Sequence, residues 1–382
     1  MKPFRFAFAA LLGSLLLASC TSDDAPLAPQ EEVPLTFIAV AEGGSGPVQI
    51  NMQTGGGSAE IVDLGAELGV SFLENGRRQI DEEGIAYFTW QEQQSAVYAK
   101  QWETGTVFRA TDICGFSTEN DMPKIIRSLW GNSEFSVMVY SAFPANGPPE
   151  TRVRINPRGS AQCTDLFLAD AGEDGVLDAL LGDGLLVLYY RAAITREPTL
   201  GLVDLATGEV MTTISAGTAF QAATLRDGEL LIFQTDFTFE SYQTATMRFG
   251  PGGAIPGFPI QNEGLFSSSF AGDQMLVRYI YQQPSLFFSQ PASYDLAQGR
   301  FAAGGEPFLP GLQARMQAET GNRPLFGNFD TDLETGRSLV VYVKGDGSPE
   351  GGVVLTDFEG AVLEVIPLPL VPERVILRGV QR

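Results

Sequence analysis

A turn that ends in glycine recurs seven times along this chain, each time between two runs of strand-forming residues. The spacing of the final glycines ranges from 45 residues (Gly208 to Gly253) to 61 residues (Gly299 to Gly360). Glycine suits this position because it adopts a positive φ without a steric penalty. Seven recurrences at one period predict a fold built from repeated supersecondary units. The turns are Met52-Gln53-Thr54-Gly55, Trp102-Glu103-Thr104-Gly105, Asn156-Pro157-Arg158-Gly159, Leu205-Ala206-Thr207-Gly208, Gly250-Pro251-Gly252-Gly253, Leu296-Ala297-Gln298-Gly299 and Asp357-Phe358-Glu359-Gly360.

A second pair of strands precedes each hairpin after the first, and the later strand of that pair is the most hydrophobic in the repeat. A continuous apolar run predicts a strand buried on both faces. The hairpin strands alternate instead, as in Thr151-Arg152-Val153-Arg154-Ile155, which predicts one wet face. This gradient is typical of a four-stranded blade packed between two neighbours. The apolar runs are Ala86–Trp90, Phe135–Tyr140, Leu185–Tyr190, Leu230–Phe233, Met275–Ile280 and Leu339–Val343.

Four strands per repeat at a period near fifty predict an all-β fold, a β-propeller. The hairpin from Val203 to Glu209 also resembles the blade hairpins of several propeller superfamilies, without selecting one. Only one strand, Leu35–Ala41, precedes the first hairpin, and an extra strand, Glu373–Val380, follows the last. Placing that C-terminal strand innermost in the first blade closes the ring and removes its exposed edges. We therefore predict seven four-stranded antiparallel blades over residues 35–382, with six or eight blades as alternatives.

The N-terminal residues have the parts of a secretory signal. Lys2 and Arg5 precede an apolar run from Phe6 to Leu17, which is too short to span a bilayer as a helix. The run closes with Leu17-Ala18-Ser19-Cys20, which resembles the lipobox of bacterial lipoproteins. The resemblance implies that residues 1–19 are removed as a signal peptide and that Cys20 is acylated, with palmitate as one of its chains. An ordinary signal peptide with a chance cysteine is the alternative.

Residues 20–34 follow as the lipidated cysteine and a polar tether. Three prolines and Glu31-Glu32 give this segment too little apolar surface to collapse, so we predict disorder. Ser22-Asp23-Asp24 resembles the acidic export signal of Bacteroidota surface lipoproteins, and a solvated linker is the alternative. We expect a protein held in the cell outer membrane through its Cys20 acyl anchor, on the periplasmic face or at the cell surface.

Composition excludes several classes of function. Acidic residues outnumber basic ones 46 to 24, for a net charge of −22. Such a surface repels phosphate backbones, so no nucleic-acid partner is expected. The chain has no histidine, which excludes Ser-His-Asp and Cys-His catalysis and zinc sites that need imidazole. No glycine-rich loop opens a helix to cradle a phosphate, and we expect no cofactor.

Connections of variable length fall on one face of a propeller, and variable loops on a rigid scaffold are common binding sites. The connection from Pro310 to Pro324 contributes Arg315 and Arg323 to this candidate binding face. Aromatic residues in two neighbouring loops can stack on sugar rings or anchor a protein partner. Alternatively they fold back as caps over the blade cores. They are Phe237, Phe239, Tyr242, Tyr281, Phe287 and Phe288.

Two weaker patterns concern metals and disulfides. Asp330, Asp332 and Glu334 have the spacing of a calcium loop but lack its glycine, so a polar turn is the favoured interpretation. Cys114 and Cys163 stand at different offsets from their turn glycines. The difference is about 16 Å along equivalent strands, well beyond the ~7 Å limit for a bridge. We expect no disulfide between them.

No catalytic constellation stands out. Hydrolysis by two carboxylates remains open in so acidic a chain, but no spacing selects a pair. We therefore expect a non-catalytic component of the envelope that binds a protein or glycan ligand or serves in protein assembly. The alternative is a propeller enzyme, a carboxylate-dependent glycoside hydrolase or lyase acting on polysaccharide.

Overall fold

The computed structural model describes residues 34–378, except 45, 70–75, 92–93, 112, 114, 116–122, 161 and 260–262. The chain divides into two compact units, Met1–Pro34 and Leu35–Arg382. The predicted signal peptide, Cys20 and the tether up to residue 33 lie outside the described residues. Within the described ranges, no helix is long and apolar enough to cross a membrane.

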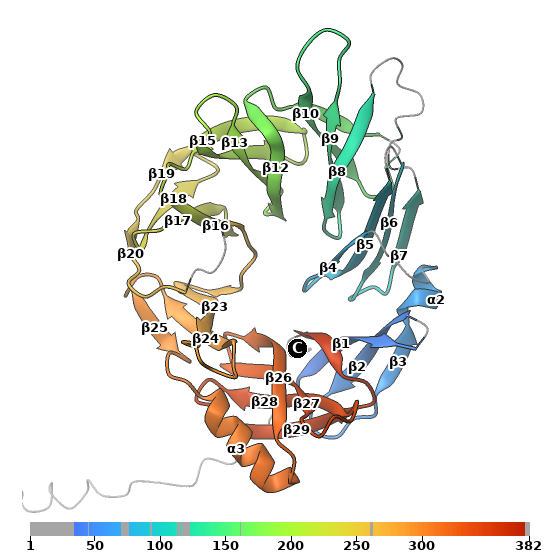
Figure 1. The fold of residues 1–382 in the computed structure, drawn as a ribbon, viewed down its shortest axis with the longest axis vertical. Helices are drawn as coiled ribbons and strands as arrows, with labels where there is room; N and C mark the ends of the chain where they lie inside the picture. The colour runs from blue at the N-terminus through green and yellow to red at the C-terminus, as the bar shows by residue number, and fades with distance from the viewer. Residues whose placement is uncertain are drawn as a thin grey trace, which may run out of the picture. The chain divides into compact units, whose positions relative to one another are not determined.

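The second unit is a ring of seven antiparallel four-stranded blades, which confirms the predicted seven-bladed β-propeller (Figure 1). From the inner strand outward, blade one contains β30 (Pro372–Leu377), β1 (Thr36–Gly43), β2 (Gly46–Gln53) and β3 (Glu60–Asp63). Blade two contains β4 (Gly76–Ile80), β5 (Gly84–Gln91), β6 (Gln94–Gln101) and β7 (Val107–Thr111). Blade three contains β8 (Lys124–Gly131), β9 (Phe135–Ala142), β10 (Glu150–Pro157) and β11 (Thr164–Phe167). Blade four contains β12 (Ala171–Gly182), β13 (Leu185–Ala192), β14 (Pro198–Asp204) and β15 (Glu209–Ser215).

Blade five is the least regular. It contains β16 (Phe220–Arg226), β17 (Glu229–Gln234), β18 (Thr238–Gln243) and β19 (Arg248–Phe249), with β20 (Gly253–Ala254) also on β18 and β21 (Gly264–Leu265) parallel to β16. Blade six contains β22 (Phe270–Ala271), β23 (Gln274–Ile280), β24 (Ser289–Asp295) and β25 (Arg300–Ala303). Blade seven contains β26 (Pro324–Asp332), β27 (Arg337–Lys344), β28 (Gly351–Asp357) and β29 (Val362–Leu368). Two helices occur among the described residues, α2 (Leu64–Leu68) and α3 (Leu309–Thr320).

Seven hydrophobic clusters hold the blades together, one between each pair of neighbours. The second strands bury both faces, as the continuous apolar runs predict. In β13, Leu186 and Leu188 pack toward blade three, while Val187 and Tyr189 pack toward blade five. Because strand side chains alternate, one fully apolar strand supplies the cores on both sides of its blade.

The C-terminal strand closes the ring, as predicted. β30 pairs with β1 from Phe37 opposite Leu377 to Ala41 opposite Pro372. Its Val375 joins the cluster between blades seven and one, and Ile376 joins the cluster between blades one and two. The last strand of the chain thereby fixes the first blade to both of its neighbours.

Two faces of the ring differ in their connections. The face with the turns between first and second and between third and fourth strands is called the turn face. The face with the loops between second and third strands and between blades is called the loop face. Six of the seven predicted glycines end third-to-fourth-strand turns at positive φ, from 62° at Gly299 to 84° at Gly55. The glycine pattern therefore correctly predicted six of the third-to-fourth-strand turns on the turn face.

Blade five departs from that prediction. Its third and fourth strands are joined by residues 244–247, where Met247 takes the left-handed conformation at φ 53°. The predicted turn Gly250-Pro251-Gly252-Gly253 instead interrupts the outer strand between β19 and β20. The glycine-rich signal misplaced this hairpin because the true turn has no glycine.

Cys163 is disulfide-bonded, whereas the sequence analysis expected no bridge between this cysteine and Cys114. The chain holds two other cysteines, Cys20 and Cys114, and both lie outside the described residues. The predicted separation assumed that both bridge candidates occupy fourth strands. Cys163 precedes β11, which begins at Thr164, and β7 ends at Thr111, so that offset does not apply.

Candidate functional site

The predicted aromatic residues divide into exposed and buried ones. Phe288 is 66% exposed and Phe237 is 50% exposed, and both lie in second-to-third-strand loops of the loop face. Tyr242 and Phe239 belong to β18 and face the blade cores. There Tyr242 meets the ring of Phe249 edge-on at 5.1 Å, so these side chains support the fold.

The other two predicted aromatics, Tyr281 and Phe287, cap blade six. The Tyr281 hydroxyl donates to the Gln290 side chain and accepts a 3.1 Å bond from the backbone N–H of Leu309. Burial raises the pKa of Tyr281 to about 12. Phe287 is partly buried, with its ring 5.5 Å from Tyr281 and 6.3 Å from Phe326. This network matches the capping alternative for both residues.

The predicted loop from Pro310 to Pro324 is mostly the helix α3. It forms because Leu309, Leu312 and Met316 share one buried face. Arg315 donates to the carbonyl of Gly360 and Arg323 donates to Gln313 at 3.1 Å. These two predicted binding residues therefore fasten the helix to the ring.

The calcium candidate separates into two structural roles. Asp330 accepts a 2.8 Å bond from the backbone N–H of Leu377 on β30. Asp332 accepts bonds from the backbone N–H groups of Glu334 and Thr335 and so shapes the turn before β27. Among the described residues, no three acidic or cysteine side chains are grouped so that they could hold a metal ion.

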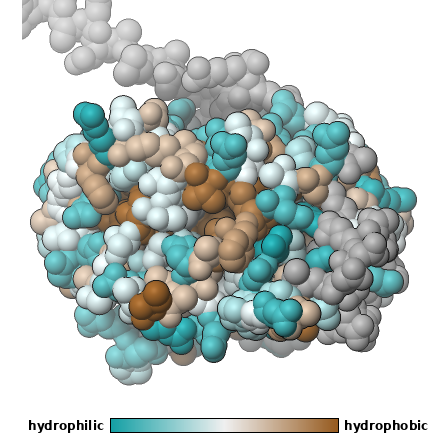
Figure 2. Space-filling model, turned by 90° about the horizontal axis from the view of Figure 1, so that it is seen from above, coloured by the Kyte–Doolittle hydropathy of each residue, from teal (hydrophilic) through white to brown (hydrophobic). Residues whose placement is uncertain are grey.

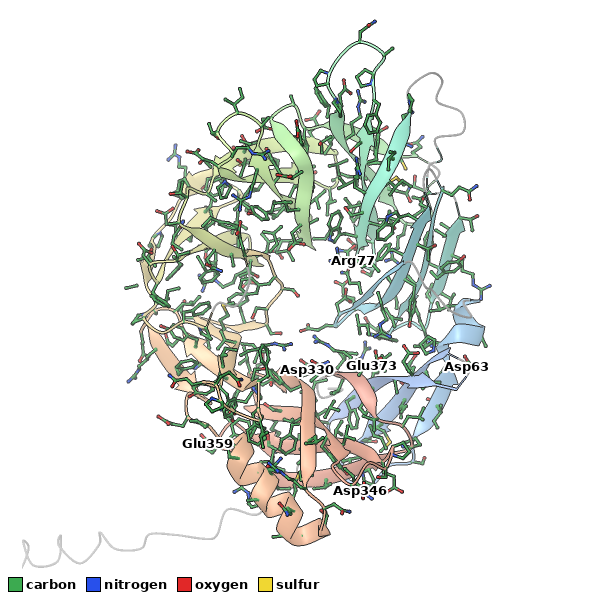
Figure 3. All side chains as sticks on the ribbon, viewed as in Figure 1. Asp63, Arg77, Asp330, Asp346, Glu359 and Glu373 are labelled. Atoms are coloured by element: carbon green, nitrogen blue, oxygen red, sulfur yellow. The ribbon has the colours of Figure 1, made fainter. Side chains whose placement is uncertain are left out.

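Charged side chains gather around the axis of the ring. Figure 3 places Arg77, Asp330 and Glu373 near the middle of the view. Arg78 pairs with Glu373 and, at 2.7 Å, with Glu42. The guanidinium of Arg77 lies 5.1 Å over the ring of Trp130, and burial lowers its pKa. Burial likewise raises the pKa of Asp330.

The carboxylates near the axis are engaged by groups of the chain itself. Asp178 accepts 3.0 Å and 2.9 Å bonds from the backbone N–H groups of Leu265 and Ala179. Glu82 accepts a 2.9 Å bond from the hydroxyl of Ser269, which joins blade two to the segment before blade six. A glycosidase instead places two carboxyl groups on either side of a scissile bond. This pattern of engagement favours a structural role for these carboxylates.

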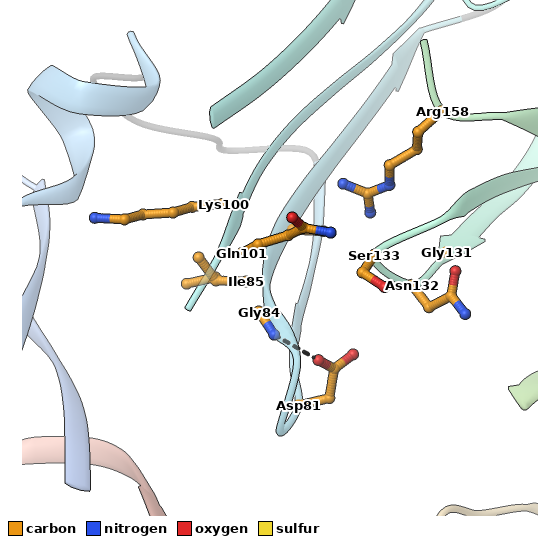
Figure 4. A pocket seen from close by; sticks show the side chains of 10 residues that line it. Asp81, Gly84, Ile85, Lys100, Gln101, Gly131, Asn132, Ser133 and Arg158 are labelled. Atoms are coloured by element: carbon orange, nitrogen blue, oxygen red, sulfur yellow. Dashed lines mark hydrogen bonds between the residues drawn. The ribbon is translucent and has the colours of Figure 1, made fainter. Parts of the chain in front are cut away.

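A small cavity lies on the turn face between blades two and three (Figure 4). Asp81 and Arg158 line it, and the Asp81 carboxylate accepts a 2.9 Å bond from the backbone N–H of Gly84. Burial lowers the pKa of Arg158 to about 10 and raises that of Asp81. The cavity measures about 10 Å³, which accommodates one water molecule and no larger ligand.

Most exposed large apolar side chains lie either on the outermost strands or at the loop face. Five of them lie on outermost strands, and apolar residues gather near the middle of the rim seen in Figure 2. Of the rest, five lie in second-to-third-strand loops or where β26 begins at the loop face, in the consecutive blades four to seven. They are Ile194 (94% exposed), Leu286 (77%), Phe288 (66%), Leu325 (54%) and Phe237 (50%).

We call these five side chains the apolar arc. The sequence analysis predicted the two phenylalanines of the arc as binding residues. It did not predict Ile194, Leu286 and Leu325, because among the apolar residues of the loops it considered only aromatic ones. The sequence does contain a signal for Ile194. It is a large aliphatic residue in the short connection that follows the apolar run of β13, with Thr195-Arg196 directly after it.

Comparison with known proteins identifies no family. No family model matches the chain, and no curated protein matches it. Among solved structures, BamB from Moraxella catarrhalis is 11% identical, with 87% of this chain and 91% of that chain covered at a TM-score of 0.38. Apo AztD from Citrobacter koseri is 8% identical, with 90% and 98% covered at 0.41. The computationally designed Ika8 protein is 11% identical, with 88% and 85% covered at 0.42. The assignment of the propeller rests on the strand pairing of this chain.

Proposed function

We propose that this chain is a lipoprotein of the bacterial outer membrane that binds a protein partner through the loop face of its propeller. The apolar arc carries this proposal. Its side chains occupy four consecutive blades, and apolar groups exposed together on one face are typical of protein interaction sites.

The composition of the arc favours a protein over a glycan. Sugar rings are bound by stacking on flat aromatic faces, and three of the five side chains are aliphatic: Ile194, Leu286 and Leu325. Aliphatic and aromatic side chains together complement the apolar core of a protein interface. The engaged carboxylates near the axis likewise favour binding over hydrolysis.

The lipid anchor belongs to the proposal through the Leu17–Cys20 motif. Leu35, the first residue of the ring, is tied to the turn face because its N–H donates to the Thr54 hydroxyl at 2.8 Å. Leu35 therefore lies on the face opposite the apolar arc. We expect Cys20→Ala to abolish membrane association, because acyl chains supply the membrane affinity. A membrane-bound Cys20→Ala variant, or a mature N-terminus other than acylated Cys20, would contradict the anchor.

Photo-crosslinking in cells tests the loop face. A benzophenone amino acid replaces Phe288 in one variant and Phe249 in the other. Phe249 is a matched control because it is 56% exposed but lies on the rim in β19. We expect a protein adduct of defined mass at Phe288 and none at Phe249. Equal adducts at both positions, or none at Phe288, would refute the proposed interface, and polysaccharide cleavage by the purified chain would support the enzyme alternative.

A further inference from the structure

Blade six lacks most of its inner strand. β22 covers only Phe270–Ala271, whereas the inner strand of blade four, β12, covers Ala171–Gly182. β22 pairs with β23 only at Met275 and Gln274. Two further bonds reach Leu276: its N–H donates to Ser269 at 2.9 Å, and its carbonyl accepts from the Ser268 hydroxyl at 2.6 Å. In the described part of the chain, the rest of β23 has no strand on its inner side. Figure 1 shows β23 at the inner side of this blade.

Along the uncovered part of β23, the backbone groups on the inner side have no hydrogen-bond partner among the described residues. Neighbouring residues of a strand direct their N–H and C=O groups to opposite edges. Because Leu276 bonds toward the inner side, Arg278 and Ile280 point the same way. Pro291 stands opposite Arg278 on β24 and has no N–H to donate, which agrees with this assignment. The open edge therefore runs from Arg278 toward the loop face, where the next loop carries Leu286 and Phe288.

Two arginines stand beside this edge without an ion-pair partner in the described ranges. Arg278 is exposed, and its guanidinium lies 5.1 Å over the ring of Phe329 on the neighbouring β26. The Nε atom of Arg374, on β30, is buried and accepted by no described group. Although its side chain reaches solvent, partial desolvation of the Arg278 guanidinium lowers its pKa, and the nearby charge of Arg374 lowers it further.

The carboxylates near this pair are engaged by other groups of the chain. The positive charge of Arg374 favours the ionised form of Asp330. The Asp330 carboxylate already accepts bonds from the N–H groups of Leu377 and Thr331, at 2.8 Å and 2.9 Å. Glu82, whose charge also acts on Asp330, accepts a 2.9 Å bond from the Ser269 hydroxyl. In the described ranges neither carboxylate forms an ion pair with Arg278 or Arg374. A carboxylate supplied by a ligand is the natural complement of a guanidinium, which it binds through charge-assisted hydrogen bonds.

We propose that an extended acidic peptide segment of the protein partner binds as the missing inner strand of blade six, with a carboxylate placed between Arg278 and Arg374. The open edge supplies main-chain hydrogen bonds, as in other cases of strand addition. Alternation along the added strand directs one side chain in two toward blade seven, where the arginines lie. The inference rests on the proposed function, because the partner whose segment binds here is the one that covers the apolar arc.

The occupant is a segment of the partner rather than of this chain. The acidic tether carries Asp23, Asp24, Glu31 and Glu32, so its charge is suitable. However, the open edge leads to the loop face, whereas the chain enters the ring at Leu35 on the turn face. The length of the opening, from Arg278 to Ile280, suits a short extended segment.

A defined peptide tests the site directly. The probe is a fluorescent seven-residue peptide of alternating valine and aspartate, compared with the same peptide carrying asparagine and with one whose alternate amides are N-methylated. We expect the aspartate peptide to bind the full mature chain and to slow hydrogen exchange at the N–H groups of Arg278 and Ile280. The asparagine peptide should bind about tenfold or more weakly, because it loses the charge-assisted hydrogen bonds to the arginines. The N-methylated peptide should also bind about tenfold or more weakly, because it cannot donate main-chain hydrogen bonds to the open edge.

Matched substitutions separate this site from nonspecific attraction. Arg278→Gln and Arg374→Gln should each weaken the aspartate peptide about tenfold or more, and Arg248→Gln, on the rim in β19, should leave it unchanged. No binding of the aspartate peptide, or equal binding to Arg278→Gln and Arg248→Gln, would overturn the proposal. Protection of Arg278 before any peptide is added, lost when the acidic tether residues become amides, would identify the tether as the occupant and also overturn it. A persisting adduct at Phe288 alongside any of these results would leave the loop-face interface standing.

Discussion

Ring closure by the C-terminal strand can be tested through a single buried side chain, Ile376. It is 2% exposed and packs in the cluster between blades one and two. Ile376→Ala removes three carbon atoms from this core, which amounts to about 2.4 kcal/mol at ~0.8 kcal/mol each. The cavity that remains adds to this loss, and such substitutions commonly cost about 2–5 kcal/mol. We therefore expect the free energy of unfolding to fall by that amount.

Ile61→Ala is the matched control for this prediction. Ile61 belongs to the same blade, on β3, and is 53% exposed, so its truncation should change stability by no more than about 0.5 kcal/mol. Urea unfolding followed by tryptophan fluorescence measures both variants. Deleting residues 372–382 should destabilise the ring more than Ile376→Ala does, since the whole strand is lost. Equal losses for Ile376→Ala and Ile61→Ala would refute the claim that β30 closes the ring.

Three further predictions concern other parts of the ring. Peptide mapping without reduction should link Cys163 to Cys114, because Cys20 is the residue that we propose to be acylated. Cys163→Ser should then cost about 4 kcal/mol for a loop of roughly 50 residues, and a link to Cys20 would contradict the lipid anchor. Arg154 is 2% exposed and donates to Asp165 through two nitrogens at 2.8 Å and 2.6 Å. Asp165→Ala should therefore lower the free energy of unfolding in urea by about 3–5 kcal/mol, and a loss below about 1 kcal/mol would contradict this. Burial raises the pKa of Asp330 above its unfolded value, which is near 3.9. Between these two pKa values the native state binds more protons than the unfolded state, so the stability that this group contributes falls as pH rises. Relative to the wild type, Asp330→Asn should therefore gain stability from about pH 4 to pH 7, and parallel stability curves would contradict this.

The repeat pattern by itself determined the architecture. Glycines such as Gly105 and Gly208 mark turns because the left-handed conformation is a local requirement. Continuous apolar strands such as β13 signal burial on both faces for an equally local reason, the alternation of side chains along a strand. The single strand before the first hairpin and the extra strand at the end sufficed to predict closure through β30. The pattern failed in blade five, where Met247 adopts a conformation that glycine usually supplies.

Tertiary structure alone decided which side chains form a surface or a site. Phe287 and Phe288 are neighbours in the sequence, yet one packs on Tyr281 and the other is exposed, because exposure depends on what the other blades place nearby. Arg278 and Arg374 come from different blades, and only the curvature of the closed ring and the shortness of β22 bring them to one open edge. Local patterns encode strands and turns, whereas contacts between blades depend on how all seven repeats pack around one axis.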